Sequence, residues 1–368
     1  MESIQVQRTP FFKFVSANAV PNAVKAWLIA GLVMVFFQIV IGGITRLTGS
    51  GLSITKWEIV TGTLPPMTEA TWQSEFELYK ATPQYIKINQ GMALSEFKFI
   101  YFWEYFHRLW ARTMALVFVV GFTFFLFKGM FSRELLRWAG LVVLLAAIEG
   151  CLGWIMVASG LKQRPWVNAY NLTLHLSMGF TIFSVLYWAT LRAVQPSVAF
   201  FSNNRLRKFT GALVAVLAVQ IVLGALMSGM KAGLAYPTWP KMGSVWIPSV
   251  LSDTSHWNMD SLVAYDAKDF TPALVQLFHR STAYITSFMV VYLFVRLRNT
   301  GKVSKSITVS NILLITLLIT QVTLGILTLV GCIGHIPVTL GVLHQGCAIL
   351  LLAVLLFVYY QMKPKYMA

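Results

Sequence analysis

Eight stretches of about 20 mostly apolar residues constrain the fold of this chain more than any other feature. Hydrophobic residues make up 57% of its 368 positions, and charged residues only 11%. A membrane-spanning helix needs about 20 apolar residues, whereas a barrel strand is half as long and alternates. We therefore predict an all-α polytopic membrane protein with eight transmembrane helices. The predicted spans are 25–45, 103–127, 138–159, 170–191, 209–230, 273–295, 309–331 and 338–360.

The net charge of +16 is distributed in a way that argues against a nucleic-acid partner. Sixteen of the 29 basic residues fall at the chain ends or in every second connection between spans. Connections rich in Lys and Arg stay on the cytoplasmic side. We therefore expect both termini to lie in the cytoplasm, or in the matrix if the protein is organellar. The sixteen are Arg8, Lys13, Lys25, Lys128, Arg133, Arg137, Arg192, Arg205, Arg207, Lys208, Arg296, Arg298, Lys302, Lys305, Lys363 and Lys365.

The first 24 residues contain neither a cleavable signal nor an Arg/Ser-rich transit sequence. We expect a bacterial inner (cytoplasmic) membrane, or the mitochondrial inner membrane for an organellar protein. The protein would be multi-pass and surrounded by membrane lipid. The cysteines Cys151, Cys332 and Cys347 do not form a disulfide framework, and no C-x-x-C-H motif for covalent haem attachment is present.

Four histidines lie at similar depth in four of the predicted spans: His107, His175, His279 and His344. Each lies about one to two turns inside the start of an even-numbered span, roughly 6–10 Å below the outer boundary at the helical rise per residue. An ionisable side chain inside a membrane is costly and indicates function. Two pairs of histidines at matched depth predict axial ligands for two haems within a helical bundle.

The two halves of the chain repeat one another. Adding 182 takes Gln38 to Gln220, and adding 172 takes the motif at His107 to that at His279. We therefore predict two tandem, duplicated four-helix bundles at 25–191 and 209–361. A cytoplasmic segment at 1–24, a linker at 192–208 and a tail at 362–368 complete the predicted domains.

Each odd-numbered span carries Gln or Glu four residues before a glycine, and residues four apart share a helix face. These pairs are Gln38 with Gly42, Glu149 with Gly153, Gln220 with Gly224, and Gln321 with Gly325. Small residues permit close helix packing, and a flat macrocycle beside a glycine needs the same lack of side chain. Both interpretations are compatible with the sequence.

Two long outer loops, at about 46–102 and 231–272, are too apolar and rich in Trp for simple linkers. We interpret them as lids over the two sites, with Trp57 and Trp239 at matched positions. Basic residues near the outer boundary are candidates for contact with haem propionates, or else for headgroup contact. They are Arg46, Lys56, Arg108, Lys231, Lys241 and Arg280.

The two halves differ in their acidic residues. Glu104, three residues before His107, corresponds to Gln276, and Glu149 corresponds to Gln321. A carboxylate beside a haem can accept protons, whereas an amide cannot. The difference predicts that the first half performs chemistry and the second holds a permanent cofactor, with Glu104 as the catalytic residue. A simple i, i+4 ion pair with Arg108 is the alternative for Glu104.

Two roles remain open for Glu149: helix packing and a part in the function. His256 and His335 lie in outer loops without counterparts in the other half, so we expect surface or accessory positions for them. A non-catalytic di-haem cytochrome b that passes electrons from quinol also explains four histidines, but not the loss of carboxylates from one half. A transporter needs a polar midplane pathway, and the midplanes here are almost wholly apolar.

Five segments carry a resemblance to a known family. They are "GGITRLTGSGLSITKW", "EYFHRLWAR", "NLTLHLSMGF", "QLFHRSTAY" and "TLGVLHQG". The chain resembles the haem A synthase family, in its proteobacterial and mitochondrial branch, from Lys25 to about Tyr360. Some bacterial relatives carry paired cysteines in the outer loops, which this chain lacks, so no redox role for such a pair is transferred.

The resemblance implies an oxidoreductase that oxidises the C8 methyl group of haem O to a formyl group, giving haem A for terminal oxidases. It implies that His107 and His175 hold the substrate haem and that His279 and His344 hold haem b and its iron. Expected partners are the haem O substrate, a haem O synthase that supplies it, an electron-transfer partner and a second copy of the chain.

Overall fold

Eight long helices build the protein, which we describe from a computed structural model. The structure describes residues 14–16, 20–57, 61–161, 164–195, 203–300 and 304–362. The predicted tail beyond 362, and most of the predicted segment at 1–24, lie outside these ranges. The long helices are α1 (Asn22–Leu47), α4 (Leu94–Phe127), α5 (Arg133–Gly160), α6 (Ala169–Val194), α7 (Asn204–Gly229), α10 (Phe270–Arg298), α11 (Lys305–Val330) and α12 (Val338–Gln361).

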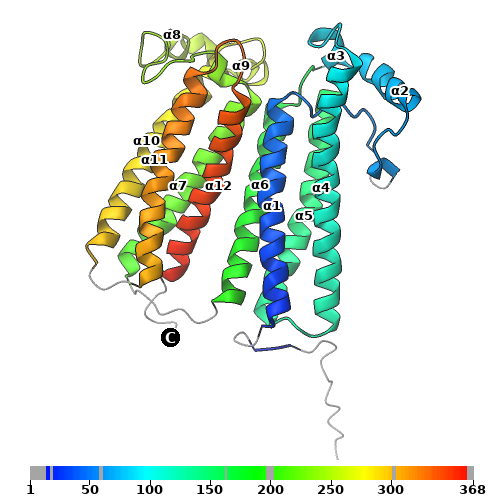
Figure 1. Cartoon of the computed structure of the whole chain (residues 1–368). Helices are drawn as coiled ribbons and strands as arrows, with labels where there is room; N and C mark the ends of the chain where they lie inside the picture. The colour runs from blue at the N-terminus through cyan, green and yellow to red at the C-terminus, as the bar shows by residue number, and fades with distance from the viewer. Residues whose placement is uncertain are drawn as a thin grey trace, which may run out of the picture.

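Seven of these helices are long and apolar enough to cross a membrane, so the chain is an all-helical, multi-pass membrane protein. The part of the chain that the structure describes contains no β-strand beyond an isolated bridge between Met242 and Val245. Helix α10 is not among the seven, although it has 29 residues and runs the full length of the bundle (Figure 1). Its first half carries His279, Arg280 and several hydroxyl-bearing residues, which lower its mean hydropathy.

The two outer loops fold into short helices at one end of the bundle (Figure 1). The first loop contains η2 (Thr61–Thr63), α2 (Glu69–Lys80) and α3 (Pro83–Lys87), and the second contains η3 (Ala232–Leu234), α8 (Ser249–Ser252), η4 (Thr254–His256) and α9 (Met259–Val263). Helix α1 begins and helix α12 ends at the opposite end (Figure 1). The short helices of the two loops therefore cover one end of the bundle, and the start of α1 and the end of α12 lie at the other end.

Helix α4 begins nine residues earlier than the predicted span at 103. Its first turns are amphipathic and pack on the short helices of the first outer loop, which explains the difference. The rings of Phe76 in α2 and Phe97 in α4 stack with centroids 5.0 Å apart, and Tyr79 lies 5.1 Å from Phe97. Phe97 and Tyr79 are fully buried there. The start of α4 is thus part of the folded outer loop.

The long helices pack in two neighbouring groups of four. Helices α1, α4, α5 and α6 contact one another in sequence, as do α7, α10, α11 and α12, and α1 and α6 meet α7 and α12 between the groups. One apolar core contains residues from all eight helices, among them Leu28, Leu186, Leu213 and Leu355. This core occupies the end where α1 begins. The histidines lie toward the other end, below the short helices.

Candidate functional site

Each of the four histidines contacts the Gln or Glu of the preceding long helix. The amide nitrogen of Gln38 lies 3.2 Å from His107 Nδ1, and that of Gln220 lies 3.2 Å from His279 Nδ1. The same contact joins Gln321 Nε2 to His344 Nε2 at 3.3 Å. The repeated sequence pattern is therefore a repeated contact between neighbouring helices.

The fourth contact uses a carboxylate, since Glu149 Oε1 in α5 lies 3.2 Å from His175 Nδ1 in α6. The Oε1 atoms of Gln38, Gln220 and Gln321 are buried without a hydrogen-bond partner among the described residues. The amide oxygens of Gln38 and Gln220 are therefore free to accept a ring N–H, whereas His344 Nδ1 lies 3.1 Å from the backbone carbonyl oxygen of Gln321, which is its acceptor. A histidine that binds iron through Nε2 needs such an acceptor for Nδ1–H.

The glycine four residues after each Gln or Glu makes room for the imidazole ring. A methyl group added at Gly325 would lie 2.9 Å from His344 Cε1, and one at Gly42 would lie 3.0 Å from His107 Cε1. The corresponding distances are 3.1 Å at Gly153, against His175, and 3.3 Å at Gly224, against His279. The glycines therefore let each imidazole ring pack closely against the preceding long helix. All four rings lie beside the last two turns of these helices, which are α1, α5, α7 and α11.

In the second half, His279 and His344 line the same cavity between the helices. Gln220 and Gln321 also line it, and most of its wall is apolar. Leu176 of α6 contributes from the first half. Two imidazoles that line one apolar cavity, each in contact with a glutamine of the preceding helix, fit a haem that would be held by both histidines.

Glu104 of α4 is buried, with 2% of its surface exposed, and it holds the outer loop. Its Oε2 accepts hydrogen bonds from Ser53 Oγ and from the backbone N–H of Ile54, both at 2.8 Å. Its Oε1 accepts from Arg108 at 2.5 Å, so the i, i+4 ion pair is present. In the second half, Gln276 donates instead to the carbonyl of Tyr236 at 3.0 Å. Both residues attach an outer loop, and only Glu104 does so with a charge.

The arginines that follow His107 and His279 bind loop carbonyls. Arg108 donates to the carbonyls of Ile54 and Lys56, and its guanidinium lies 4.9 Å from the ring centre of Trp57. Arg280 donates to the carbonyls of four loop residues, Tyr236, Thr238, Pro240 and Lys241. Arg280 and Trp239 also line the second-half cavity, and the Nε of Arg280 has no partner among the described residues.

The remaining basic candidates have other neighbours. Arg46, at the end of α1, donates to the carbonyls of Ser228 at 2.8 Å and Gly229 at 3.4 Å, where α7 ends. Lys231 lies 4.0 Å from the ring centre of Trp166, and burial together with Arg46 lowers the pKa of its ammonium. Lys56 forms an ion pair with Glu75 at 3.8 Å. Lys241 supplies a carbonyl to Arg280.

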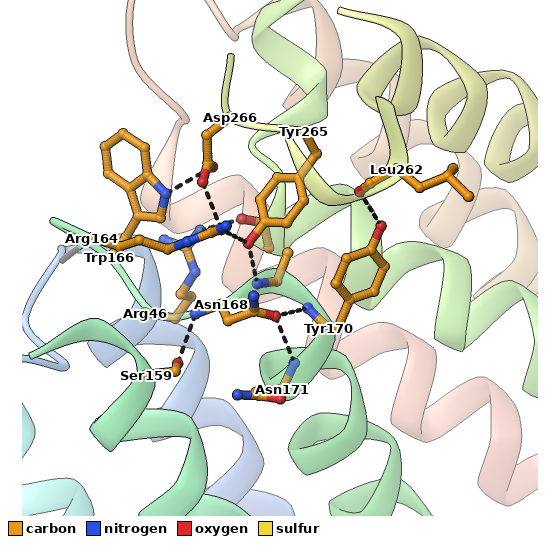
Figure 2. A network of polar contacts seen from close by, with 12 residues as sticks. Arg46, Ser159, Arg164, Trp166, Asn168, Tyr170, Asn171, Leu262, Tyr265 and Asp266 are labelled. Carbon is orange, nitrogen blue, oxygen red and sulfur yellow. Dashed lines mark hydrogen bonds and ion pairs between the residues drawn. The ribbon is translucent and has the colours of Figure 1, made fainter. Parts of the chain in front are cut away.

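A network of polar contacts joins the two halves above α6 (Figure 2). The hydroxyl of Tyr265 accepts hydrogen bonds from the backbone N–H of Ala169 at 2.8 Å and from Arg164 at 2.6 Å. Asp266 accepts from Arg164 at 2.7 Å and from the indole of Trp166 at 2.9 Å (Figure 2). The second outer loop therefore caps the start of the helix that carries His175. Sequence reasoning did not find this network.

The other residues singled out from the sequence lie apart from these contacts. His256 pairs with Asp253 at 3.6 Å in the second outer loop, and His335 is in the connection before α12. The three cysteines, all within the described ranges, are free thiols. Cys332 is buried and donates to the carbonyl of Thr328. Burial raises the pKa of the Cys332 thiol, which suits an unreactive side chain.

Taken together, the fold and the histidines define a helical, multi-pass membrane protein with four histidines on long helices, each packed against a glycine of the preceding long helix. The family model COX15-CtaA, described as cytochrome oxidase assembly protein, matches residues 25–356. The chain therefore belongs to this family of cytochrome oxidase assembly proteins, which confirms the resemblance found in the sequence.

Curated relatives match almost the whole chain. A haem A synthase of Rhodospirillum centenum is 40% identical over 348 residues, which cover 94% of this chain and 90% of the relative. A haem A synthase of Nitrosospira multiformis is 38% identical over 351 residues, covering 94% and 95%. A haem A synthase of Flavobacterium psychrophilum is 38% identical over 339 residues, covering 90% and 96%.

Proposed function

We propose that this protein is a haem A synthase that acts on haem O. The single observation that carries the proposal is the arrangement of four histidines, each placed against a glycine and a Gln or Glu side chain on the preceding long helix. The family match and the haem A synthases that align with nearly the whole chain support the same function. The histidines would hold the haem without a covalent attachment, since the chain has no C-x-x-C-H motif.

The proposed reaction is the oxidation of the C8 methyl group of haem O to a formyl group. In balanced form, the methyl group and one water give the alcohol, two protons and two electrons. The alcohol and a second water give a geminal diol, two more protons and two more electrons, and the diol loses water to form the aldehyde. The protein must fix the ring, accept protons near the methyl group and pass electrons onward. We assign the fixing of haem O to His107 and His175, and the acceptance of protons to Glu104.

His279 and His344 are the proposed ligands of a resident haem b, whose chemistry when bound is one-electron transfer. Both line one cavity whose polar groups are few and include Gln220 and Gln321, which supports this assignment. Arg280 is the strongest candidate for a propionate contact, because it lines that cavity and has a free Nε. Arg46, Arg108, Trp57 and Trp239 remain candidates for the edges of the two sites. A haem O synthase would supply the substrate, and a membrane electron acceptor would take the electrons.

We also propose that α10 crosses the membrane, which makes eight spans in two duplicated bundles at 25–191 and 209–361. The length of α10 and its contacts with α7 and α11 support this, as does the position of both described chain ends on one side (Figure 1). Several polar residues of α10 face the cavity or an outer loop: His279 lines the cavity, and Gln276 and Arg280 donate hydrogen bonds to loop carbonyls. By the distribution of basic residues, both termini are cytoplasmic.

The test of the function is to supply haem O to the full chain in its membrane. The protein is expressed together with a haem O synthase in cells that make no haem A, and the extracted haems are separated by chromatography. We expect haem A and the alcohol intermediate alongside haem B. The His175→Ala variant, inserted at a normal level, should contain haem O and no haem A. Haem B and unconverted haem O, with no haem A or alcohol intermediate in the parent sample, would contradict the proposal and favour an electron-carrying cytochrome b.

A further inference from the structure

The partner of His175 differs in charge from the partners of the other three histidines. His107, His279 and His344 each contact a glutamine amide, whereas His175 contacts the carboxylate of Glu149. The four contacts occupy equivalent places in the fold, because each joins neighbouring helices and involves a residue four positions before a glycine that faces the ring. The contact at His344 differs in detail, since its Nδ1 lies 3.1 Å from the backbone carbonyl oxygen of Gln321. One of four matched positions therefore carries a negative charge, and it lies in the half that is proposed to bind the substrate.

The surroundings of Glu149 direct its charge toward the imidazole. Glu149 Oε1 lies 3.2 Å from His175 Nδ1, and a methyl group added at Gly179 would lie 3.5 Å from the same oxygen. Glu149 Oε2 and His175 Nδ1 are both buried without a hydrogen-bond partner among the described residues, so Oε1 and Nδ1 face each other at ion-pair distance and not in a formed hydrogen bond. The only cationic or potentially cationic group recorded against Glu149 in the described chain is His175 itself. Packing alone would be served as well by a glutamine, as at the three other positions.

A carboxylate beside a ligating histidine has two known physical effects. It accepts the N–H of the ring nitrogen that does not bind the metal, which fixes the tautomer and the ring orientation, and it makes the ligand a stronger donor. A stronger, more negative donor favours the ferric over the ferrous state, and so lowers the reduction potential of a haem iron. An amide has the first effect and much less of the second.

We propose that Glu149 is a positioning residue that acts through His175 to make the first-half haem a weaker oxidant than the second-half haem. This inference rests on the proposed function, because it needs a haem at both histidine pairs. Electrons move from a centre of lower potential to one of higher potential. Glu149 therefore sets the direction in which electrons leave the site where the methyl group of haem O is oxidised, toward the pair His279 and His344.

The chain offers a matched set of variants for this proposal. Glu149→Gln gives His175 the same partner as the other three histidines without a change of side-chain size. The double variant Glu149→Gln with Gln38→Glu returns the negative charge to the same haem through the opposite ligand, His107. Gln321→Glu places the carboxylate beside His344, in the second half. Every substitution in the set exchanges a carboxylate and an amide of the same size, in one direction or the other, at one of the four matched positions.

The experiment is a potentiometric titration of the purified full-length protein, obtained with haem O bound, followed by visible absorption. The second-half component is the one that disappears in His344→Ala. In Glu149→Gln, the ferrous-to-ferric ratio of the other component at a fixed potential should rise about tenfold, a shift of about 59 mV for one electron. The double variant should reverse this shift, and Gln321→Glu should lower the potential of the second-half component.

The outcomes separate this inference from the proposed function. Two haem components whose potentials stay unchanged in Glu149→Gln would overturn the inference and leave the haem sites in place. A shift in Glu149→Gln that the double variant does not reverse would also overturn it, because the charge would then not act through the axial ligands. A purified protein without haem, in the parent and in every variant, would overturn the proposed function itself.

Discussion

The carboxylate of Glu104 accepts the backbone N–H of Ile54 over 2.8 Å, so a residue of α4 holds the outer loop that follows α1. The same carboxylate binds Ser53 and Arg108, which leaves it buried and fully engaged with the loop. A group that accepts protons near the substrate would have to exchange one of these contacts. Glu104 can therefore act as a proton acceptor, as a loop anchor or as both, and the roles are separable by mutation.

Glu104→Gln should lower the turnover of haem O by about 100-fold, the lower range for loss of a general base. Haem b content should stay normal, because the changed residue is in the first half. Ser53→Ala is the matched control, since it removes one loop contact and keeps the carboxylate, and it should retain most of the turnover. Haem A formation at the parent rate in Glu104→Gln would end the catalytic role. An equal loss in both variants would assign Glu104 to the loop alone.

Replacement of His279 or His344 by Ala should remove the low-spin haem b spectrum from the purified protein. Each histidine lines the second-half cavity and contacts its own glutamine on the preceding helix. Neither histidine can therefore replace the other as an iron ligand. His256→Ala is the control, because His256 lies in the outer loop beside Asp253. A full bis-histidine spectrum in both cavity variants would refute the ligand assignment.

The proposed orientation of the chain places both outer loops on the side of the membrane away from the cytoplasm. Single cysteines at Lys80 and Met259, in a Cys151→Ser background, should react with a membrane-impermeant maleimide added to the outer face. Met259 is 72% exposed, and the two remaining native cysteines are buried. Labelling of either position only after the membrane is opened would show that the topology is inverted or that α10 does not span.

Tyr265→Phe should destabilise the contact between the two halves. Tyr265 is 3% exposed, and its hydroxyl accepts the N–H of Ala169, which would be left without a partner. An unsatisfied buried donor costs about 1–3 kcal/mol, so the variant should unfold at a lower temperature in detergent. Tyr292→Phe, in a ring that is 43% exposed on α10, is the matched control. Equal unfolding temperatures for the two variants would contradict the structural role of the network.

Periodicity and composition predicted much of the fold. Each predicted span lies within one of the long helices, with at most one residue beyond the end of that helix. A run of apolar residues long enough to cross a membrane has few other stable conformations. The start of α4 at Leu94 was missed, since Phe97 is buried by α2 and not by lipid, and hydropathy does not distinguish the two environments. The hydropathy of α10 is low because of the polar residues that define its site.

The site was predicted in part. The spacing of Gln38 and Gly42 showed a shared helix face, but their common neighbour, His107, became visible only with the packing of α1 on α4. The contact of Tyr265 with Ala169 joins residues 96 positions apart, and no local pattern in the sequence indicates it. Residues that share one helix face can thus be predicted from the sequence, whereas contacts between distant segments depend on how the helices pack.

The central claim is that this chain turns the C8 methyl group of haem O into a formyl group, and the mass of the haem product tests it most directly. Purified protein with haem O bound is allowed to turn over in the presence of an electron acceptor, and the extracted haem is analysed by mass spectrometry. The account predicts a product that has gained one oxygen and lost two hydrogens, preceded by a species that has gained one oxygen. Haem O recovered unchanged from a protein with both haem sites filled would contradict it.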